Sequence, residues 1–123
     1  MRILLLFVLS VGIASANEVK HVDAKAVVQL VSQENRPRIL DVRTAKEYSD
    51  GHLPGAANID FNRSDFEKRL AQLDKFTPYL VHCRSGSRSK KSLATFKKLG
   101  FQHIIHLDGG FKAWKKAGGT IVE

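Results

Sequence analysis

Short apolar segments alternate with amphipathic segments along most of this chain, and this alternation is the feature that most limits its fold. The apolar segments have the length of strands, and the segments between them carry apolar residues at helical spacing. We expect strands at residues 20–22, 39–42, 57–59, 79–82, 104–107 and, at an edge, 120–122, with helices beginning after Asp23, Thr44 and Ser64 and near residues 89 and 111. Helices between successive strands suit parallel crossover connections. The sequence therefore predicts an α/β fold with a mainly parallel central sheet of about five strands and helices on both faces.

The first 16 residues differ in composition from the rest. Met1-Arg2 gives a short positive end, residues 3–14 are almost entirely apolar, and Ala14-Ser15-Ala16 is a small-x-small cleavage signal. The apolar stretch is shorter than the roughly 20 residues that span a bilayer. We therefore expect a signal peptide at residues 1–16, no stable membrane span after cleavage, and one domain at residues 17–123 in the periplasm or outside the cell.

Cys83 is the only cysteine of the chain, and it lies where the apolar run Tyr79–Val81 meets a loop of small and basic residues. The helix expected near Ser89 places Cys83 on a strand-to-helix turn, at the carboxyl end of a strand where parallel sheets bind ligands. Backbone N–H groups, the helix dipole and nearby guanidinium groups favour a thiolate there. No internal disulfide partner exists. A reactive thiol is the favoured interpretation, and an inert buried cysteine or an intermolecular disulfide is the alternative.

The chain is basic, with 20 Lys and Arg against 12 Asp and Glu and a formal net charge of +8. This field favours small anionic partners. Much of the excess lies on the two last helices, at Lys90, Lys91, Lys97, Lys98, Lys112, Lys115 and Lys116. Because no nucleic-acid-binding motif accompanies these lysines, a solvated face is favoured and no nucleic-acid partner is expected.

The loop Cys83-Arg84-Ser85-Gly86-Ser87-Arg88 resembles the active-site loop of the rhodanese family of sulfurtransferases. The segments Asp41-Val42-Arg43 and Gly51–Ile59 resemble the family's amino-terminal signature, while Leu107–Phe111 with Trp114 resembles its carboxyl-terminal one. A signal peptide before a single domain further resembles the small periplasmic members, including the phage-shock type. These segments cover nearly all of the chain after residue 16, in the family's order.

This resemblance implies a double-displacement reaction without a metal or another cofactor. We separately expect the protein to be a monomer. Cys83 would take a sulfane sulfur from a donor, become a persulfide and pass the sulfur to cyanide or a thiol. The resemblance implies that donor and sulfur are held by Arg84, Ser85, Gly86, Ser87, Arg88 and Ser89. The N–H groups of the loop would surround the outer sulfur, and Arg84 and Arg88 would hold the donor's anionic group. Two arginines favour thiosulfate or a similar dianion as the donor.

Two other functions share parts of this pattern. The loop is also similar to that of cysteine-based phosphatases and arsenate reductases, whose cysteine and arginine are one residue farther apart. Four residues separate Cys83 from Arg88, which gives a smaller cradle suited to one sulfur atom. The other alternative is a rhodanese-like sulfur carrier or binding module. Inactive modules typically lose the cysteine, and this chain keeps it.

Several polar residues near these motifs have a structural and a functional interpretation. His82 precedes Cys83, but adjacent strand residues point to opposite faces, so we expect a packing role and not a Cys–His pair. Asp41 and Glu47 are expected to orient loop arginines or to stabilise the fold. Arg43 has two open roles, contact with the donor anion or a structural salt bridge. The histidines His52, His103 and His106 show no metal-ligand spacing with Cys83.

Overall fold

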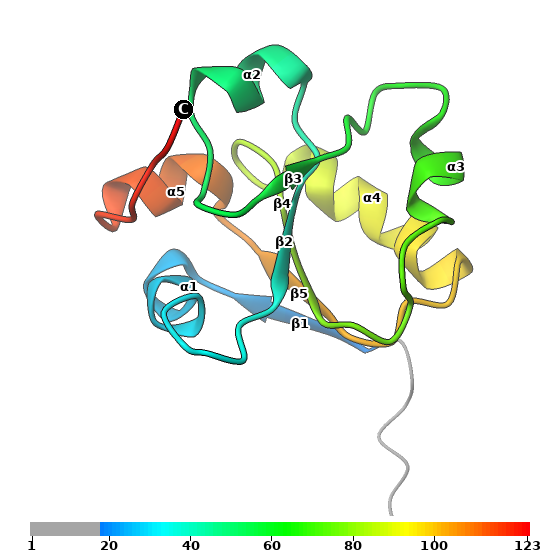
Figure 1. The fold of residues 1–123 in the computed structure, drawn as a ribbon, viewed down its shortest axis with the longest axis horizontal. Helices are drawn as coiled ribbons and strands as arrows, with labels where there is room; N and C mark the ends of the chain where they lie inside the picture. The colour runs from blue at the N-terminus through cyan, green and yellow to red at the C-terminus, as the bar shows by residue number, and fades with distance from the viewer. Residues whose placement is uncertain (1–17) are drawn as a thin grey trace, which may run out of the picture.

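The computed structural model describes residues 18–123, and the signal peptide expected at residues 1–16 lies outside the described residues. Five strands form one sheet in the order β1-β5-β4-β2-β3, and every neighbouring pair is parallel (Figure 1). The strands are β1 (Val19–Val22), β2 (Arg38–Asp41), β3 (Ala57–Asn58), β4 (Tyr79–His82) and β5 (Ile104–Leu107). The predicted α/β fold with a parallel central sheet is confirmed.

Five helices connect these strands: α1 (Ala24–Leu30), α2 (Ala45–Asp50), α3 (Phe66–Leu70), α4 (Ser87–Lys98) and α5 (Gly110–Lys116). Asp23 caps α1 by accepting a hydrogen bond from the backbone N–H of Ala26, as its place before an apolar helical face predicts. Thr44 and Glu47 form a reciprocal capping box at the start of α2. These caps explain why both helices begin where the sequence indicates.

Two details of the predicted elements are wrong. No sixth strand forms at residues 120–122, where Val122 makes only an isolated antiparallel bridge with His52. The helix near residue 89 begins earlier, at Ser87, because Gly86 adopts a left-handed conformation and serves as its N-cap. The helix therefore starts within the loop that follows Cys83, and Ser89 lies in its first turn.

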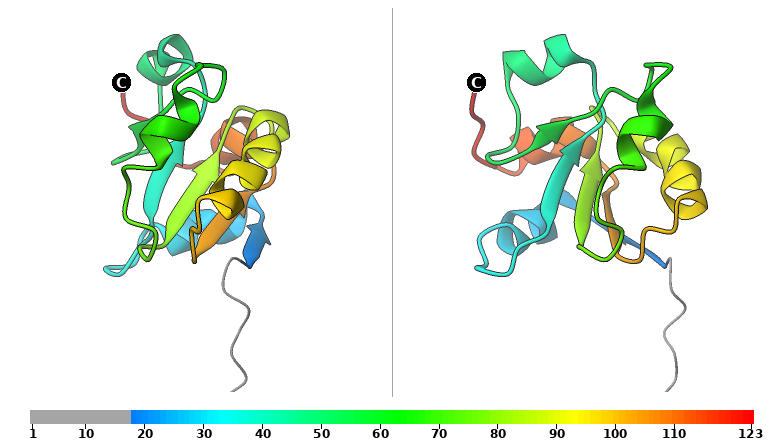
Figure 2. Two further views of the ribbon diagram at one scale, coloured as in Figure 1. Left: turned by 90° about the vertical axis from the view of Figure 1, so that its right-hand side faces the viewer. Right: turned by 45° about the vertical axis from the view of Figure 1, so that its right-hand side comes forward.

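Helices cover both faces of the sheet, as Figure 2 shows in its two turned views. Neighbouring residues of β4 illustrate the division, because side chains alternate between the faces of a strand. Leu80 packs in a cluster with residues of α1 and α5, while Val81 and Cys83 belong to a second cluster with residues of α3 and α4. The central strand is buried along its whole length, so the residue at its carboxyl end is held between two packed layers.

The carboxyl ends of β2 and β4 lie side by side at one end of the sheet, because the two strands are parallel and Asp41 pairs with His82. At this end of the sheet, α2 follows β2, and the Cys83 loop and α4 follow β4 (Figure 1). Asp41, Arg43 and the loop after Cys83, which the sequence indicated as candidate site residues, therefore lie at the same end of the molecule. Within residues 18–123, no helix has both the length and the apolar character required to cross a membrane.

Candidate active site

Cys83 follows β4 directly and its side chain points into the loop that leads to α4. Its Sγ accepts hydrogen bonds from the backbone N–H of Gly86 at 3.1 Å and from the Ser89 hydroxyl at 3.3 Å. Gly86 has a φ of 103°, and a Cβ there would collide with the carbonyl oxygen of Asp108. Only glycine therefore fits this position. The loop curls around the sulfur because it can pass close to the backbone after β5.

The loop lowers the pKa of the Cys83 thiol below its ordinary value. Burial alone raises this pKa, because Cys83 is only 1% exposed. Hydrogen bonds from the Ser89 hydroxyl and from the backbone N–H groups of Ser89, Gly86 and Ser85 act in the opposite direction and outweigh burial. The surroundings of the sulfur thus favour a thiolate, the form of cysteine that acts as a nucleophile.

The other predicted loop residues lie around this sulfur in different environments. Arg84, Ser85 and Ser87 are exposed, Arg88 is half-buried, and Gly86 and Ser89 are buried. The backbone of the loop is also held from the opposite side, because the N–H groups of Phe111 and Lys112 donate to the carbonyls of Cys83 and Arg84 at 2.8 and 2.9 Å. The start of α5 therefore fixes the first residues of the loop.

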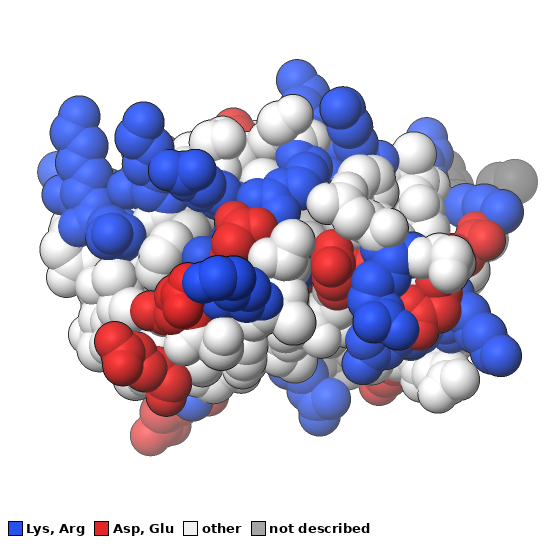
Figure 3. All heavy atoms as spheres, turned by 90° about the horizontal axis from the view of Figure 1, so that it is seen from above, with Lys and Arg blue, Asp and Glu red and all other residues white. Residues whose placement is uncertain are grey.

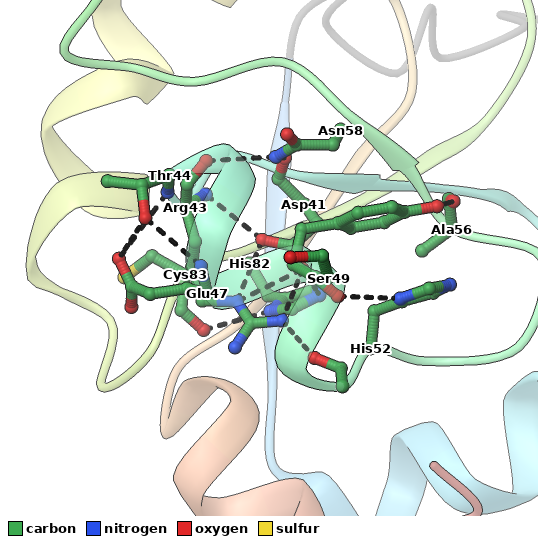
Figure 4. Close-up of polar contacts among 12 residues, drawn as sticks. Asp41, Arg43, Thr44, Glu47, Ser49, His52, Ala56, Asn58, His82 and Cys83 are labelled. Atoms are coloured by element: carbon green, nitrogen blue, oxygen red, sulfur yellow. Dashed lines mark hydrogen bonds and ion pairs between the residues drawn. The ribbon is translucent and has the colours of Figure 1, made fainter. Parts of the chain in front are cut away.

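His82 lies on the other side of β4 from the thiol, as strand alternation predicts. Its Nδ1 donates to the backbone carbonyl of Cys83 at 2.8 Å (Figure 4). Its ring stacks on Phe111, with ring centroids 6.5 Å apart. Burial lowers the pKa of His82, which favours the neutral ring. His82 therefore supports the backbone of the loop and makes no pair with the Cys83 thiol.

Arg43 forms the structural salt bridge that was one of its two expected roles. Its guanidinium group is 3% exposed and contacts both carboxylate oxygens of Asp41, with Nη2 at 2.7 Å from Oδ2. The same Nη2 donates to the Gly51 carbonyl at 2.7 Å, and the group lies over the Phe111 ring. These contacts join β2, the loop after α2 and α5 at one point of the site, and Figure 4 shows Arg43 beside Asp41.

Arg88 pairs with a carboxylate of this chain. Its two terminal nitrogens donate to the two oxygens of Glu47, at 2.7 and 2.9 Å. The hydrogen bond from Arg88 is the largest cause that lowers the Glu47 pKa to about 2, and Thr44 contributes further. Glu47 thus does orient a loop arginine, and it links the capping box of α2 to the first turn of α4. A contact of Arg88 with a sulfur donor stays a prediction.

A basic pocket of about 530 Å³ lies beside the loop, between α2 and α5. Arg84, Lys112 and Lys115 line it, and within residues 18–123 none of the three makes an ion pair. The pocket's other charged residues are paired: Arg43 with Asp41, Glu47 with Arg88 and Asp50 with Lys46. Figure 3 views the molecule from this end and shows many basic side chains on it. The pocket is thus suited to an anion.

A histidine of β5 is linked to Cys83 through Ser89, and sequence reasoning missed this link. The Nε2 of His106 lies 2.7 Å from the Ser89 hydroxyl, and its Nδ1 lies 2.7 Å from a carboxylate oxygen of Asp108. His21 of β1 contacts the same oxygen at 2.7 Å. Strand alternation contained a signal, because Ile104, His106 and Asp108 must share a face. The pairing of His21 with His106 depends on the register of two strands far apart in the sequence.

Within residues 18–123, His21, His106 and Asp108 also form a group whose spacing would admit a metal ion. One ligand atom from each lies within 4.8 Å of the others. Both Nδ1 atoms, however, contact one carboxylate oxygen directly at hydrogen-bond length. Direct hydrogen bonds therefore account for this cluster.

The fold and the loop together define a class of protein: a parallel α/β domain with a cysteine of lowered thiol pKa in a strand-to-helix turn. A model of the family described as "Rhodanese-like domain" matches residues 23–117. The chain belongs to the rhodanese family. The matched range contains Cys83, the loop after it and the pocket that Arg84 and the α5 lysines line.

Curated relatives carry names from sulfur chemistry. The chain is 31% identical over 98 residues to thiosulfate sulfurtransferase GlpE of Shewanella oneidensis, covering 80% of this chain and 94% of that protein. It is 32% identical over 100 residues to "Putative sulfur carrier protein YrkF" of Bacillus subtilis, covering 81% of this chain and 53% of that protein. The chain thus spans about half the length of one relative and nearly all of the other.

Solved structures agree with the family assignment. The solution NMR structure of the rhodanese-like domain of the Anabaena protein Alr3790 superposes with a TM-score of 0.74 at 29% identity, covering 83% of this chain and 77% of that one. A rhodanese-related protein of Thermoplasma volcanium has a TM-score of 0.73 at 24% identity, covering 84% of this chain and 97% of that one, and shows the likeness of fold.

Proposed function

We propose that this protein is a thiosulfate sulfurtransferase that uses Cys83 as a persulfide intermediate. The observation that supports this most is the position of Sγ, which accepts a hydrogen bond from the N–H of Gly86 at 3.1 Å inside a curled loop. Such a ring of backbone donors stabilises a negative sulfur, whether it belongs to a thiolate or to the outer atom of a persulfide. The family and the relatives named sulfurtransferase support the same chemistry.

In the first half of the proposed reaction, the Cys83 thiolate attacks the sulfane sulfur of thiosulfate. A new sulfur–sulfur bond forms to Cys83, the sulfur–sulfur bond of thiosulfate breaks, and sulfite leaves with the bonding electron pair. In the second half, a nucleophile such as cyanide or a thiol attacks the outer sulfur of the persulfide. The Cys83 thiolate is released, with the transferred sulfur on the acceptor. No metal or other cofactor takes part in this scheme.

The basic pocket supports an anionic donor. Thiosulfate carries two negative charges, and Arg84, Lys112 and Lys115, which make no ion pair within residues 18–123, offer complementary charge beside the loop that follows Cys83. Because Arg88 is engaged by Glu47, we propose that Arg84 and the two lysines contribute more to donor affinity than Arg88 does. The loop residues Ser85, Gly86, Ser87 and Ser89 then surround the transferred sulfur through their backbone.

Intact-mass measurement after exposure to thiosulfate tests the proposal. The wild-type protein is expected to gain the mass of one sulfur atom, to lose it on addition of cyanide with release of thiocyanate, and to gain none after Cys83→Ser substitution. His103→Gln is a suitable control, because His103 is exposed. A wild-type protein that gains no sulfur from thiosulfate would overturn the proposal.

A sulfur carrier is the second candidate, supported by the name of the relative YrkF. An enzyme turns over many equivalents of thiosulfate with cyanide or a small thiol, whereas a carrier accepts one sulfur and releases it only to a partner protein. Steady-state thiocyanate formation therefore separates the two. A single stoichiometric transfer, with no turnover, would favour the carrier.

We also propose that residues 1–16 are a signal peptide and that the protein acts in the periplasm or outside the cell. The positive start, the apolar stretch and the Ala14-Ser15-Ala16 site support this. Expression of the full chain in a bacterium with a periplasm, followed by fractionation and N-terminal sequencing, tests it. Mature protein beginning at Asn17 in the periplasm is expected, and uncleaved protein in the cytoplasm would contradict it.

A further inference from the structure

A chain of hydrogen bonds leads from the Cys83 thiol through Ser89 and His106 to Asp108. The Ser89 Oγ lies 3.3 Å from the Cys83 Sγ and 2.7 Å from the His106 Nε2. The His106 Nδ1 lies 2.7 Å from Asp108 Oδ1. Ser89 and His106 are 0% and 1% exposed, so water does not compete readily for the contacts of Ser89 with Cys83 and His106, whereas the Asp108 side chain is 55% exposed.

The protonation of each group follows from its partners. The hydrogen bond from His106 lowers the pKa of Asp108, so this residue is a carboxylate and can only accept. His106 therefore carries a proton on Nδ1. Burial lowers the pKa of His106, which favours the neutral ring, and its Nε2 is then a lone-pair acceptor. The Ser89 hydroxyl is the donor to that lone pair.

Ser89 has one hydroxyl proton but three acceptors in reach: Cys83 Sγ, the Gly86 carbonyl at 3.2 Å and His106 Nε2. When His106 is neutral, the hydroxyl proton points to Nε2, and the hydroxyl oxygen is free to accept a hydrogen bond from the thiol S–H. When His106 is protonated, Nε2–H donates to Ser89, and the hydroxyl proton is free to bond the thiolate. The neutral thiol of Cys83 thus goes with a neutral His106 ring, and the Cys83 thiolate goes with a protonated His106 ring.

We propose that Ser89, His106 and Asp108 form a proton relay that activates Cys83. The S–H bond of Cys83 breaks, its proton passes to Ser89 Oγ, and the original hydroxyl proton passes to His106 Nε2. A thiolate and an imidazolium replace a neutral pair, with no change of oxidation state. His106 acts on Cys83 through Ser89 and is a positioning residue that does not touch the substrate. The proposal deepens the proposed function, because it concerns the same thiol.

The groups that face His106 decide how easily it accepts the proton. They are His21 of β1, with ring centroids 5.3 Å apart, His82 of β4, Lys90 of α4 and Asp108 after β5. Asp108 stabilises the imidazolium, whereas Lys90 and His21, when charged, oppose it. The opposition matters because a histidine that is already protonated cannot accept the proton of the thiol.

The rate of Cys83 alkylation by iodoacetamide as a function of pH tests the relay. His106→Gln leaves an amide able to reach Ser89 but unable to take up a proton, and Ser89→Ala removes the link. Both are expected to raise the apparent pKa of the thiol by about one unit, which slows alkylation at pH 7 about tenfold. His103→Gln, an exposed control, should leave the profile unchanged. A His106→Gln profile that superposes on that of the wild type would overturn the relay.

A second measurement needs no change at a relay residue. NMR titration of the His106 ring should give a higher apparent pKa in the wild type than in Cys83→Ala, because the thiolate stabilises the imidazolium. Equal values in the two proteins would contradict the proposal. Neither measurement requires sulfur transfer. A protein that takes no sulfur from thiosulfate but shows this coupling would refute the proposed function and leave the relay standing.

Discussion

Charge and burial divide the arginines of the site into two kinds. Arg43 and Arg88 each face a carboxylate at 2.7 Å, with Asp41 and Glu47 as partners, so much of their charge is neutralised within the fold. Arg84 is exposed beside the basic pocket, and within residues 18–123 it has no such partner. The positive charge of Arg84 is therefore available to bind an incoming anion. The same residue type thus holds the loop in one place and offers a free charge in another.

Arg84→Gln is expected to weaken thiosulfate binding more than it slows the chemical step. An exposed charge at the rim of a pocket contributes about 1 kcal/mol, so KM should rise about fivefold while kcat changes little. Steady-state thiocyanate formation measures both constants. Lys97→Gln is the matched control, because Lys97 is an exposed cation of α4 that does not line the pocket. An equal rise of KM in both variants would show that only the general charge matters.

Gly86→Ala is expected to destabilise the fold because of two separate effects. The φ of 103° is strained for any residue with a Cβ, and that Cβ would collide with the Asp108 carbonyl. We expect a loss of about 3 kcal/mol in the free energy of unfolding, measured with urea. Gly100→Ala at the other end of α4 separates the effects. Its φ is 86° but no atom lies within 4 Å of its Cβ position, so about 1 kcal/mol is expected. Equal losses in both variants would argue against the collision.

At the scale of elements, the contact between α2 and α4 holds the end of the active loop where α4 begins, while the start of α5 holds its first residues. Glu47 forms the capping box of α2 with Thr44, and its carboxylate also accepts hydrogen bonds from both terminal nitrogens of Arg88. Arg88 lies in the first turn of α4, one residue before Ser89. The position of Ser89 beside the Cys83 sulfur thus depends on a helix that begins 42 residues earlier in the chain (residue 45 against residue 87).

The Glu47 pair gives the fold a defined dependence on pH. The pKa of Glu47 falls to about 2 in the folded state from an ordinary value of 4.5. A depressed carboxylate pKa contributes stability above the ordinary value, and this contribution is lost as pH falls through the folded value. Glu47→Gln should therefore cost on the order of 1 to 2 kcal/mol at pH 7, after allowance for screening by water, and almost nothing near pH 2.

Urea unfolding of the wild type and Glu47→Gln at several pH values between 7 and 2 measures this difference. Asp50→Asn serves as the control, because Asp50 pairs with Lys46 on the exposed surface of the same helix. Its effect should stay below about 0.5 kcal/mol at every pH. A constant difference between Glu47→Gln and the wild type across the whole range would exclude the ion pair as its source.

The order of elements was predictable from the sequence, and the contacts between distant elements were not. Alternating apolar segments indicated the parallel sheet, and Cys83 could be placed at a strand end because the run before it is apolar. The partner of Arg88 and the link from Cys83 to His106 depend on how α2, α4 and β5 pack. The segment 120–122 has strand-like residues but bridges only His52. Its backbone bonds His52 in the loop after α2 and no strand of the sheet, and local sequence pattern cannot show that.

At the scale of the whole molecule, the net positive charge should affect a charged reactant and an uncharged reactant differently. The chain has a formal net charge of +8, and the basic pocket lies beside the Cys83 loop, at the end of the sheet where the strands finish. Figure 3 shows many basic side chains at this end of the molecule. A field of this sign raises the local concentration of a dianion near the pocket and leaves an uncharged molecule unaffected. Salt screens the field, with a Debye length of about 10 Å at 0.1 M and about 3 Å at 1 M.

Salt is therefore expected to slow the reaction with thiosulfate selectively. Raising NaCl from about 0.05 M to about 0.5 M should lower kcat/KM for thiosulfate at least about threefold. Alkylation of Cys83 by iodoacetamide, an uncharged reagent, reports on the same thiol without the anion. Its rate should change much less over the same range. A parallel fall of both rates would mean that salt acts on the thiol itself, and no fall in either would mean that the basic pocket does not attract the donor.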